Sequence, residues 1–504
     1  MKKKKINRRK FIETTATSAI GFTILPSHVI STRGGKVPPS DRINVANIGC
    51  GTQGLREMGQ LLQHPDIQVT SICDPNKYST DYLDWSPFGI RDGIRRILED
   101  TTWGEGVRGI AGGRDVMQDY IEKYYAKNMP SGQYKGVKSF EDFRELLEKD
   151  TGIDAVKIMT PDHLHAPIAI AAMKKGKHVI THKPIANRMI EGRKTINTAR
   201  ETGVKTHLLA WSPKPDHTLI LSWIKDGVIG NLREIHNWSY RPVWPQWTSN
   251  PTDTPPVPEN FNWDLWLGPV PDRPYHPNYT HNVFRGWYDF GGGSIADMGH
   301  YSLFPLFRTF GIDKPPVSAK AYGTTTRTAV DNVCRSVNND VAFPASCLIR
   351  MQFPEQKSLP GFDLYWYDGG MKPFAPEELQ VDGRDVGSEG MMFVGDKGKI
   401  LASFLGEKPE IIPSARMSSY QGNKIAAKAS EESRTDTWAK MIKTDSESPG
   451  SFLYADCVTE TINLAAIALR VGSKVDFDSA NMKITNNESA NRFLTREYRP
   501  GWEM

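Results

Sequence analysis

Cysteine is scarce in this 504-residue sequence, which has only five, at scattered positions and without a Cys-x-x-Cys pair. An odd number without paired spacing fits neither a disulfide framework nor a zinc site, so we expect no metal site.

Long apolar runs are also missing. After the first thirty residues no stretch reaches the roughly 18 apolar residues that a membrane span needs, and we expect none in the mature protein.

The chain lacks a strong excess of charge of either sign. The formal net charge is +5, and much of it comes from the first ten residues, so the rest of the chain is close to neutral. We therefore expect no nucleic-acid partner. Charged residues make up 24% and hydrophobic residues 38%, which is ordinary for a soluble globular protein and argues against global disorder.

Residues 1–35 are predicted to be an export signal. A basic stretch precedes a modestly apolar segment at 14–25, and then come Pro26 and small or polar residues. The pair Arg8-Arg9 and its neighbours look like a twin-arginine signal, which directs folded proteins across the bacterial inner membrane. An ordinary secretory signal is the alternative. We expect cleavage before about residue 40 and an exported, periplasmic protein.

A glycine-rich loop follows the first strand pattern. Residues 43–48 predict a strand, the next six residues are Gly-Cys-Gly-Thr-Gln-Gly, and residues 55–63 predict a helix. A G-x-G-x-x-G between strand and helix is typical of dinucleotide-binding domains. There Gly49 makes the tight turn, Gly51 lets the backbone approach the pyrophosphate, and Gly54 permits close packing of helix and strand.

The start of the predicted helix and the end of the next strand complete this fingerprint. At Thr52 and Gln53 the helix N-terminus offers free N–H groups to phosphates. A second strand, predicted at 67–73, ends in Asp74, twenty residues after Gly54. A carboxylate there accepts hydrogen bonds from the adenosine ribose and repels a 2′-phosphate, which favours NAD over NADP.

The expected alternation of strands and helices is interrupted at 78–134. This stretch is predicted to be a long polar insertion, and a helix resumes at 139–149. An insertion at the carboxyl ends of strands either overhangs a ligand or is a solvated excursion. Further on, a buried strand is predicted at 153–159, and the strand at 178–181 leads into His182-Lys183-Pro184.

At this point the sequence resembles the glucose-fructose oxidoreductase, inositol dehydrogenase and MocA family (Gfo/Idh/MocA). The similarity runs from Arg42 to Trp502 and is carried by GCGTQG, MTPDHLH, GKHVITHKP, WDLWLGPVPDRPY, RGWYDFGGGSIADMGH and EYRPGW. The resemblance implies an α/β fold with a Rossmann NAD-binding domain and a second α/β domain with an open, mostly antiparallel sheet. We place the first domain at 40–212 and the second, substrate-binding domain at 213–504.

The resemblance assigns a catalytic role to Lys183. The family's Glu-Lys-Pro motif falls on His182-Lys183-Pro184, so the lysine is kept and the glutamate is replaced. A lysine beside the nicotinamide can hydrogen-bond the reacting oxygen, and burial would lower its pKa. The loop at 160–165 is implied to lie against the nicotinamide ribose. Its candidate cofactor contacts are Thr160, Pro161, His163 and His165.

A second catalytic cluster is expected on a helix that opens near Gly291. Relatives place an aspartate and a histidine four residues apart there, whereas this chain has Asp297 with His300 three residues later and Tyr301 four residues later. Both spacings bring side chains near one helix face. His300 has the more suitable unperturbed pKa and Tyr301 has the matching position, so either is a candidate acid/base.

The sugar site is expected in an aromatic- and arginine-rich stretch between these clusters. Alternation at 234–241 predicts a strand with one face toward the cleft. Aromatic faces stack on sugar rings, although core packing or a subunit interface is the commoner fate of such residues. The candidate substrate contacts are Tyr240, Arg241, Trp244, Arg285 and Trp287.

The sequence therefore predicts an NAD(H)-dependent oxidoreductase that acts on a sugar or glycoside hydroxyl, with the 3-position as the hypothetical target. Because NAD is not a pool outside the cytoplasm, an exported enzyme would need a tightly held cofactor. The alternatives are a glycosidase that works by oxidation, elimination, hydration and reduction, and a module that binds dinucleotide without catalysis. The family resemblance suggests a homo-oligomer, either a dimer or a tetramer.

Overall fold

The computed structural model describes residues 41–504 except 85, 87 and 431, so the predicted export signal lies outside the described residues. The first sheet has six strands in the order β3-β2-β1-β4-β5-β6, all parallel. Its strands are β1 (Ile43–Ile48), β2 (Ile67–Cys73), β3 (Lys138–Phe140), β4 (Ala155–Ile158), β5 (His178–Thr181) and β6 (Thr206–Leu208). The strand order reverses between β1 and β4, where doubly wound folds bind their ligands.

The helices around this sheet include two in the stretch predicted to be a polar insertion. They are α2 (Thr52–Leu62), α3 (Gly89–Leu98), α4 (Arg114–Ala126), α5 (Phe143–Lys149), α6 (Asp162–Lys174) and α7 (Met189–Thr202). Helix α4 buries Met117, Tyr120 and Ile121 in the same core as β1 and β2. These apolar residues recur at helical spacing, but the charged residues between them conceal the pattern in the sequence.

The second sheet has nine strands in the order β15-β14-β13-β7-β12-β11-β8-β16-β17. Within the described residues only the β7–β12 pair of this second sheet is parallel, which confirms the predicted, mostly antiparallel sheet. The strands are β7 (Leu232–Trp238), β8 (Ser318–Gly323), β11 (Cys347–Phe353), β12 (Phe362–Tyr367), β13 (Gly390–Gly395), β14 (Lys399–Ala402), β15 (Glu410–Ile412), β16 (Val475–Asp478) and β17 (Lys483–Ile484).

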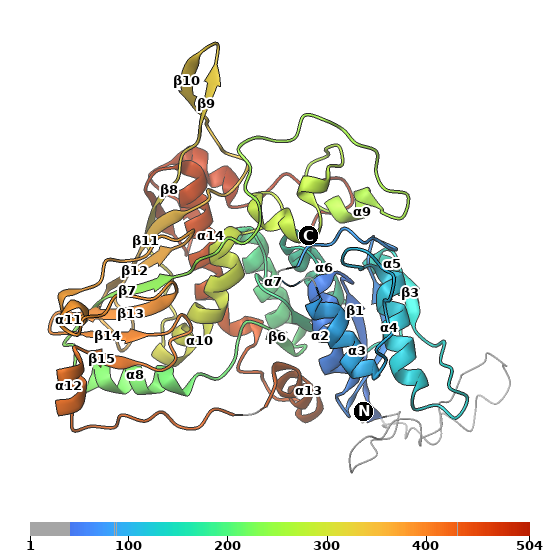
Figure 1. Ribbon diagram of the computed structural model, residues 1–504, viewed down its shortest axis with the longest axis horizontal. Helices are drawn as coiled ribbons and strands as arrows, with labels where there is room; N and C mark the ends of the chain where they lie inside the picture. Colours follow the sequence, from blue (N-terminus) through green and yellow to red (C-terminus); the bar gives the residue numbers. More distant parts are fainter. Residues whose placement is uncertain (1–40, 85, 87, 431) are drawn as a thin grey trace, which may run out of the picture.

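One face of this sheet is buried, and the other is more exposed along β11 and β12. Along β11 and β12 buried residues alternate with more exposed ones, as expected for a sheet that packs on one side. Helices α10 and α14 belong to the core on the buried side and lie between the two sheets (Figure 1). The remaining helices are α8 (Pro215–Lys225), α9 (Trp263–Leu267), α10 (His300–Phe310), α11 (Glu377–Val381), α12 (Ser414–Ser419), α13 (Arg434–Thr444) and α14 (Asp456–Val471).

A two-stranded hairpin, β9 (Arg327–Val330) and β10 (Val333–Ser336), projects away from the body of the molecule (Figure 1). All eight of its strand residues are exposed. Within residues 41–504, apart from the three undescribed positions, no helix is long and apolar enough to cross a bilayer. The same residues contain no group of three or more His, Cys, Asp or Glu that could hold a metal ion.

Candidate active site

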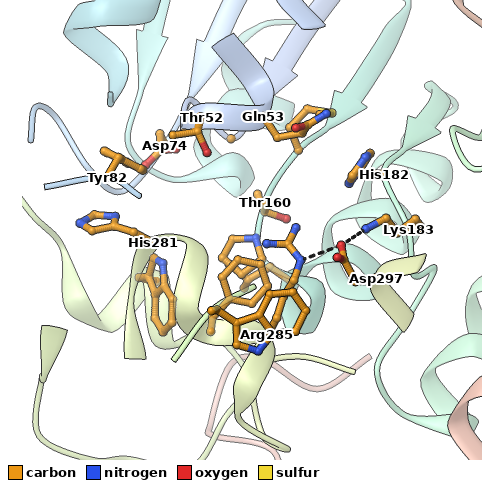
Figure 2. A pocket seen from close by; sticks show the side chains of 18 of the residues that line it. Thr52, Gln53, Asp74, Tyr82, Thr160, His182, Lys183, His281, Arg285 and Asp297 are labelled. Atoms are coloured by element: carbon orange, nitrogen blue, oxygen red, sulfur yellow. Dashed lines mark hydrogen bonds and ion pairs between the residues drawn. The ribbon is translucent and has the colours of Figure 1, made fainter. Parts of the chain in front are cut away.

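A cavity of about 330 Å³ opens at the carboxyl ends of β1, β2, β4 and β5 and extends to the second domain. One end is formed by the glycine-rich loop and Asp74, and the other by Lys183 and Asp297 (Figure 2). Predicted cofactor and catalytic residues from distant parts of the sequence thus share one space. The predicted residues that line it are Gly49, Gly51, Thr52, Gln53, Asp74, Thr160, Pro161, Lys183, Arg241, Trp244, Arg285, Asp297 and Tyr301.

The glycine-rich loop has the close contacts that its glycines were expected to allow. Gly49 has a φ of +103°, and a Cβ there would lie 2.5 Å from the carbonyl carbon of Met159. A Cβ at Gly54 would collide with the carbonyl oxygen of Gly49, so Gly54 packs behind the loop and does not line the cavity. Within the described chain no side chain caps the N-terminus of α2. Its first-turn amides can therefore receive phosphate oxygens.

Asp74 is buried at the end of β2 and is held by two backbone amides. Its Oδ2 accepts from the N–H of Cys50 at 2.6 Å, and its Oδ1 accepts from the N–H of Asn76 at 2.8 Å. Burial raises the pKa of Asp74, and these two amides oppose the shift. Each carboxylate oxygen retains acceptor capacity for a ribose hydroxyl. The glycine loop, the open helix start and this carboxylate together fit a dinucleotide.

At the other end of the cavity, Asp297 pairs with two cations. Its Oδ1 lies 2.5 Å from Nζ of Lys183 and 3.3 Å from Nε of Arg285 (Figure 2). Lys183 is 2% exposed, and His165 fixes the chain beside it, since Nδ1 of that ring lies 2.5 Å from the carbonyl oxygen of Pro184. The lysine is therefore held at the cavity wall by neighbours on both sides.

The pKa values of Lys183 and Asp297 are both lowered, but for different reasons. Burial lowers the pKa of Lys183, and the Asp297 carboxylate offsets part of that shift. Burial alone would raise the pKa of Asp297, but Lys183 and Arg285 outweigh it and hold that pKa at about 2. Asp297 is thus an ionised carboxylate at neutral pH, and Lys183 releases its proton more readily than an exposed lysine.

Tyr301 and His182 form a second pair beside Lys183. The Tyr301 hydroxyl lies 2.9 Å from Nε2 of His182, and Nζ of Lys183 lies 5.2 Å from the centre of the tyrosine ring. Burial, with the charges of Lys183 and Arg285, keeps the pKa of His182 well below its ordinary value. Burial and the Glu57 carboxylate raise the pKa of Tyr301. At neutral pH the pair is a neutral phenol hydrogen-bonded to a neutral imidazole.

The structure distinguishes the two acid/base candidates by position. Residues Ile295–Gly299 form a π-helical turn, which runs directly into α10. Asp297 and Tyr301 both line the cavity, whereas His300 lies outside the lining and is fully buried. Nδ1 of His300 lies 2.9 Å from the carbonyl oxygen of Ala296, and burial lowers the pKa of this histidine to about 3.

The two histidines after β4 are also buried behind the cavity wall. Nε2 of His163 lies 2.9 Å from the carbonyl oxygen of Trp266, which links the first domain to the second. His165 bridges the carbonyl oxygens of Thr160 and Pro184. Both rings contact the backbone of the loops that form the cavity. They shape the cofactor region from behind, whereas Thr160 and Pro161 face it directly.

Some of the predicted substrate contacts line the cavity and others lie outside it. Arg241, Trp244 and Arg285 line the cavity. Tyr240 is 49% exposed outside it, and Trp287 is buried in an aromatic core, where its indole N–H donates to the carbonyl oxygen of Asn278 at 2.7 Å. The strand β7 ends at Trp238, before Tyr240, so the predicted alternation does not continue to these residues.

Several lining residues were not predicted from the sequence. Tyr82 comes from the stretch at 78–134, which was predicted either to overhang a ligand or to be a solvated excursion. Phe261 comes from a loop of the second domain, and His281 starts a 3-10 helix there. The position of the stretch after Asp74 is the only sequence signal that pointed to any of these three residues. The other unpredicted lining residues are Pro75, Met159, Leu164, His182, Val243, Trp266, Phe284 and Met298.

Two family models match the chain. One describes the C-terminal alpha/beta domain of the GFO_IDH_MocA oxidoreductase family and matches residues 218–347 and 367–504, which is more than half of the chain. The other describes the NAD-binding Rossmann fold of the same family and matches residues 123–209. The glycine-rich loop precedes that second range, so its assignment rests on its own geometry.

Curated relatives are similar over part of the chain. A glycosyl hydrolase family 109 protein of Shewanella pealeana is 24% identical over 243 residues, which are 45% of this chain and 44% of that protein. Levoglucosan dehydrogenase of Pseudarthrobacter phenanthrenivorans is 34% identical over 114 residues, 21% of this chain and 29% of that protein. Each match thus spans less than half of the relative's length.

A solved structure has the same fold over most of the chain. The WlbA dehydrogenase from Bordetella pertussis, in complex with NADH and UDP-GlcNAcA, superposes with a TM-score of 0.50 at 14% identity. The superposition covers 87% of this chain and 99% of that one. At this identity the likeness shows the fold alone.

Proposed function

Because the chain belongs to the Gfo/Idh/MocA oxidoreductase family, we propose that it transfers a hydride between NAD(H) and a hydroxyl-bearing carbon of a sugar or glycoside. One observation carries this proposal. The buried Lys183–Asp297 ion pair faces the same cavity as the glycine-rich loop and Asp74. A dinucleotide seated on that loop would extend toward the lysine, where a substrate oxygen can meet it.

The bound nicotinamide would supply the hydride chemistry, and the chain's own groups manage the proton. When the hydrogen on a ring carbon leaves as hydride, with the electron pair of its C–H bond, the proton of the hydroxyl on that carbon must leave as well. The C=O bond then forms. Lys183 in its amine form is the base for that proton, because burial lowers its pKa. Asp297 orients the lysine, and Arg285 stabilises negative charge on the reacting oxygen.

The part of the cavity lining that the second domain contributes suits a carbohydrate. Trp244 and Phe284 offer apolar ring surface, and Arg241 and Arg285 offer donors for hydroxyl oxygens. The names of two partial relatives, a levoglucosan dehydrogenase and a glycosyl hydrolase, also point to carbohydrate substrates. We take the 3-hydroxyl of a glycoside as the target.

Glycoside cleavage is the second candidate, and the Tyr301–His182 pair is the observation that favours it. Oxidation of a ring hydroxyl to a ketone acidifies the neighbouring C–H. A base then removes that proton, the leaving group departs, water adds, and the ketone is reduced again. This sequence needs proton-handling groups besides the lysine, and Tyr301 lies beside it in the cavity. The partial relative in glycosyl hydrolase family 109 supports this candidate.

Two further parts of the proposal concern the setting of the enzyme. The basic leader with its Arg8-Arg9 pair supports export to the periplasm. An exported enzyme of this type would keep its NAD(H) and regenerate it in each cycle. The more exposed face of β11 and β12 in the second sheet supports a homo-oligomer.

The first test is to denature the purified mature protein and to analyse the released small molecules for NAD(H) by mass spectrometry. We expect about one NAD(H) per chain. A panel of sugars and glycosides is then added to the native protein while the absorbance of the bound nicotinamide is followed. A keto product supports the dehydrogenase, and a free sugar from a glycoside supports cleavage. Absence of NAD(H), with no binding of added NAD, would exclude the oxidoreductase and would leave only a non-catalytic module that binds sugar.

A further inference from the structure

The stretch that follows Asp74 pairs with the second domain. The N–H of Lys77 donates to the carbonyl oxygen of Asn260 at 2.8 Å, and the N–H of Asn262 donates to the carbonyl oxygen of Pro75 at 3.0 Å. These bonds flank an antiparallel bridge between Asn76 and Phe261. The loop beside the predicted ribose-binding carboxylate is therefore tied to a loop that lies more than 180 residues later in the sequence.

A few residues further on, a ring pair makes a second connection between the domains. The rings of Tyr82 and His281 lie 4.0 Å apart between centroids (Figure 2). Nε2 of His281 also lies 3.2 Å from Oδ1 of Asp81. Phe261 packs near the same histidine at 6.3 Å. Tyr82, Phe261 and His281 all line the cavity at the end that holds Asp74.

Tyr82 is seated against the glycine-rich loop. A Cβ at Gly51 would lie 3.0 Å from Cε1 of its ring, and a Cβ at Gly112 would lie 2.7 Å from Cε2 on the other side. The side-chain amide of Asn76 donates to the tyrosine hydroxyl at 3.0 Å. The ring is thus fixed between two glycines, directly beside the place where the backbone would approach a pyrophosphate.

His281 reaches this position from a left-handed backbone conformation, with a φ of +52°. Such a conformation is uncommon for residues other than glycine, and it is maintained where the surroundings require it. Here the ring contact with Tyr82 and the side-chain contact with Asp81 are those surroundings. The backbone of the second domain is therefore shaped to bring this ring over the adenosine end of the cavity.

We infer that Tyr82 and His281 are cofactor-retaining residues, which close the adenosine end of the cavity by joining the two domains across it. This inference rests on the proposed function, because it requires that a dinucleotide occupies the cavity. To leave, the dinucleotide would have to break the ring contact between Tyr82 and His281, the side-chain contact between Asp81 and His281, and the backbone pairing around Phe261. Release is therefore slow compared with turnover.

Slow release restricts the reaction cycle. When a hydride has been taken from the carbon of one hydroxyl group, the bound NADH cannot be reoxidised by exchange with NAD in solution. It must be returned inside the same cavity, to the oxidised sugar itself or to a second carbonyl compound that replaces it. The class of partner reaction is thus the reduction of a ketone or aldehyde by the resident cofactor, which leaves the cofactor as it began.

The test measures how fast bound NADH leaves the protein. The purified full-length mature protein is loaded with NADH, and lactate dehydrogenase with pyruvate is added to consume whatever is released. The loss of nicotinamide fluorescence gives the release rate. In Tyr82→Ala and in His281→Gly, which keeps the left-handed backbone conformation available, we expect release to accelerate about tenfold or more.

Milder variants separate retention from damage to the fold. Tyr82→Phe keeps the ring and should release NADH at nearly the wild-type rate. Asp81→Asn removes the carboxylate that contacts His281, keeps a side chain of similar size, and should accelerate release about threefold. Tyr322→Ala, at an exposed tyrosine on β8, is the matched control and should have no effect. The midpoint of thermal unfolding is measured for each variant.

The outcomes are distinct. Equal release rates in wild type, Tyr82→Ala, His281→Gly and Asp81→Asn would overturn the inference while leaving the proposed function intact. The same holds if Tyr82→Phe releases NADH as fast as Tyr82→Ala, because the ring would then not be the retaining group. If the wild-type protein binds no NADH, the proposed function falls and the inference falls with it.

Discussion

The hydroxyl of Tyr301 lies 2.9 Å from Nε2 of His182, and these are the two positions at which the chain departs from the family's catalytic pattern. At one a histidine replaces the glutamate before the lysine, and at the other a tyrosine replaces the histidine. Because the two replaced residues contact each other, we treat the two replacements as linked. Together they form a hydrogen-bonded pair that lines the cavity beside Lys183. The low pKa of His182 makes it a weak base. We therefore assign proton acceptance to Lys183 and positioning of the substrate oxygen to Tyr301.

Tyr301→Phe tests this division of roles. The variant removes one hydrogen bond to the substrate oxygen and leaves the lysine in place. We expect the rate of hydride transfer to fall about tenfold, which is the range of a single hydrogen bond. The rate is followed as absorbance of the bound nicotinamide after a reactive sugar is added. A fall beyond a thousandfold, together with loss of the pH dependence, would instead make the tyrosine the base.

Lys183→Met should have a much larger effect. The variant removes both the base and the donor to the reacting oxygen, and we expect hydride transfer to fall about a thousandfold. Asp297 keeps its ion pair with Arg285, so the protein should fold and retain NAD(H). Lys194→Met, at an exposed lysine of α7, is the control. Turnover by Lys183→Met within tenfold of the wild-type rate would refute the catalytic role and favour a binding module.

The pH dependence of oxidation should report Lys183. The amine form is the base, so the rate should fall as the pH drops through the pKa of this residue. Because burial lowers that pKa, the midpoint should lie below the ordinary lysine value of about 10.4. A single-turnover pH profile in wild type and in Tyr301→Phe is the measurement. An unchanged midpoint in the tyrosine variant supports the lysine, and a flat profile in both would exclude it.

Local sequence patterns identify the residues whose role depends on the conformation of the nearby backbone. Strands β1, β2 and β5 lie where the apolar runs place them. Gly49 follows β1 and Asp74 follows β2, and the N–H of Cys50 joins the two loops by donating to Asp74. Lys183 needed the family motif, since no local pattern marks a lysine at a strand end. Its burial and its pairing with Asp297 become visible only in the fold.

Other features depend on packing between distant segments and could not be predicted. Tyr82 and His281 are about 200 residues apart, and neither carries a periodic or motif signal. The choice between His300 and Tyr301 was also open, because spacings of three and four both bring side chains near one helix face. The π-helical turn at Ile295–Gly299 changes the local register, and Tyr301 faces the cavity while His300 packs inside.

Asp74→Ser should change the preference between cofactors. The carboxylate disfavours a 2′-phosphate and serves the ribose hydroxyls of NAD, and the serine would remove both effects. We expect the affinity for NAD to fall about tenfold and the affinity for NADP to rise relative to it. Titration of apoprotein with NADH and with NADPH, followed by nicotinamide fluorescence, gives the two dissociation constants. Asp92→Ser on α3 is the control, and an unchanged NADP-to-NAD ratio in Asp74→Ser would contradict the assignment.

His300 should make the protein less stable in acid. Its pKa is about 3 in the folded protein, against an ordinary value of about 6.5 in the unfolded chain. Between these values the unfolded chain binds a proton that the folded protein does not, so stability falls by up to about 1.4 kcal/mol for each pH unit as the pH is lowered. In His300→Leu this contribution is absent. The difference in Tm between about pH 8 and about pH 5 should therefore be smaller than in the wild type.

His207 is also buried, and its pKa is also about 3. We therefore expect the same result for His207→Leu. If neither variant narrows the difference in Tm, other groups determine the acid sensitivity.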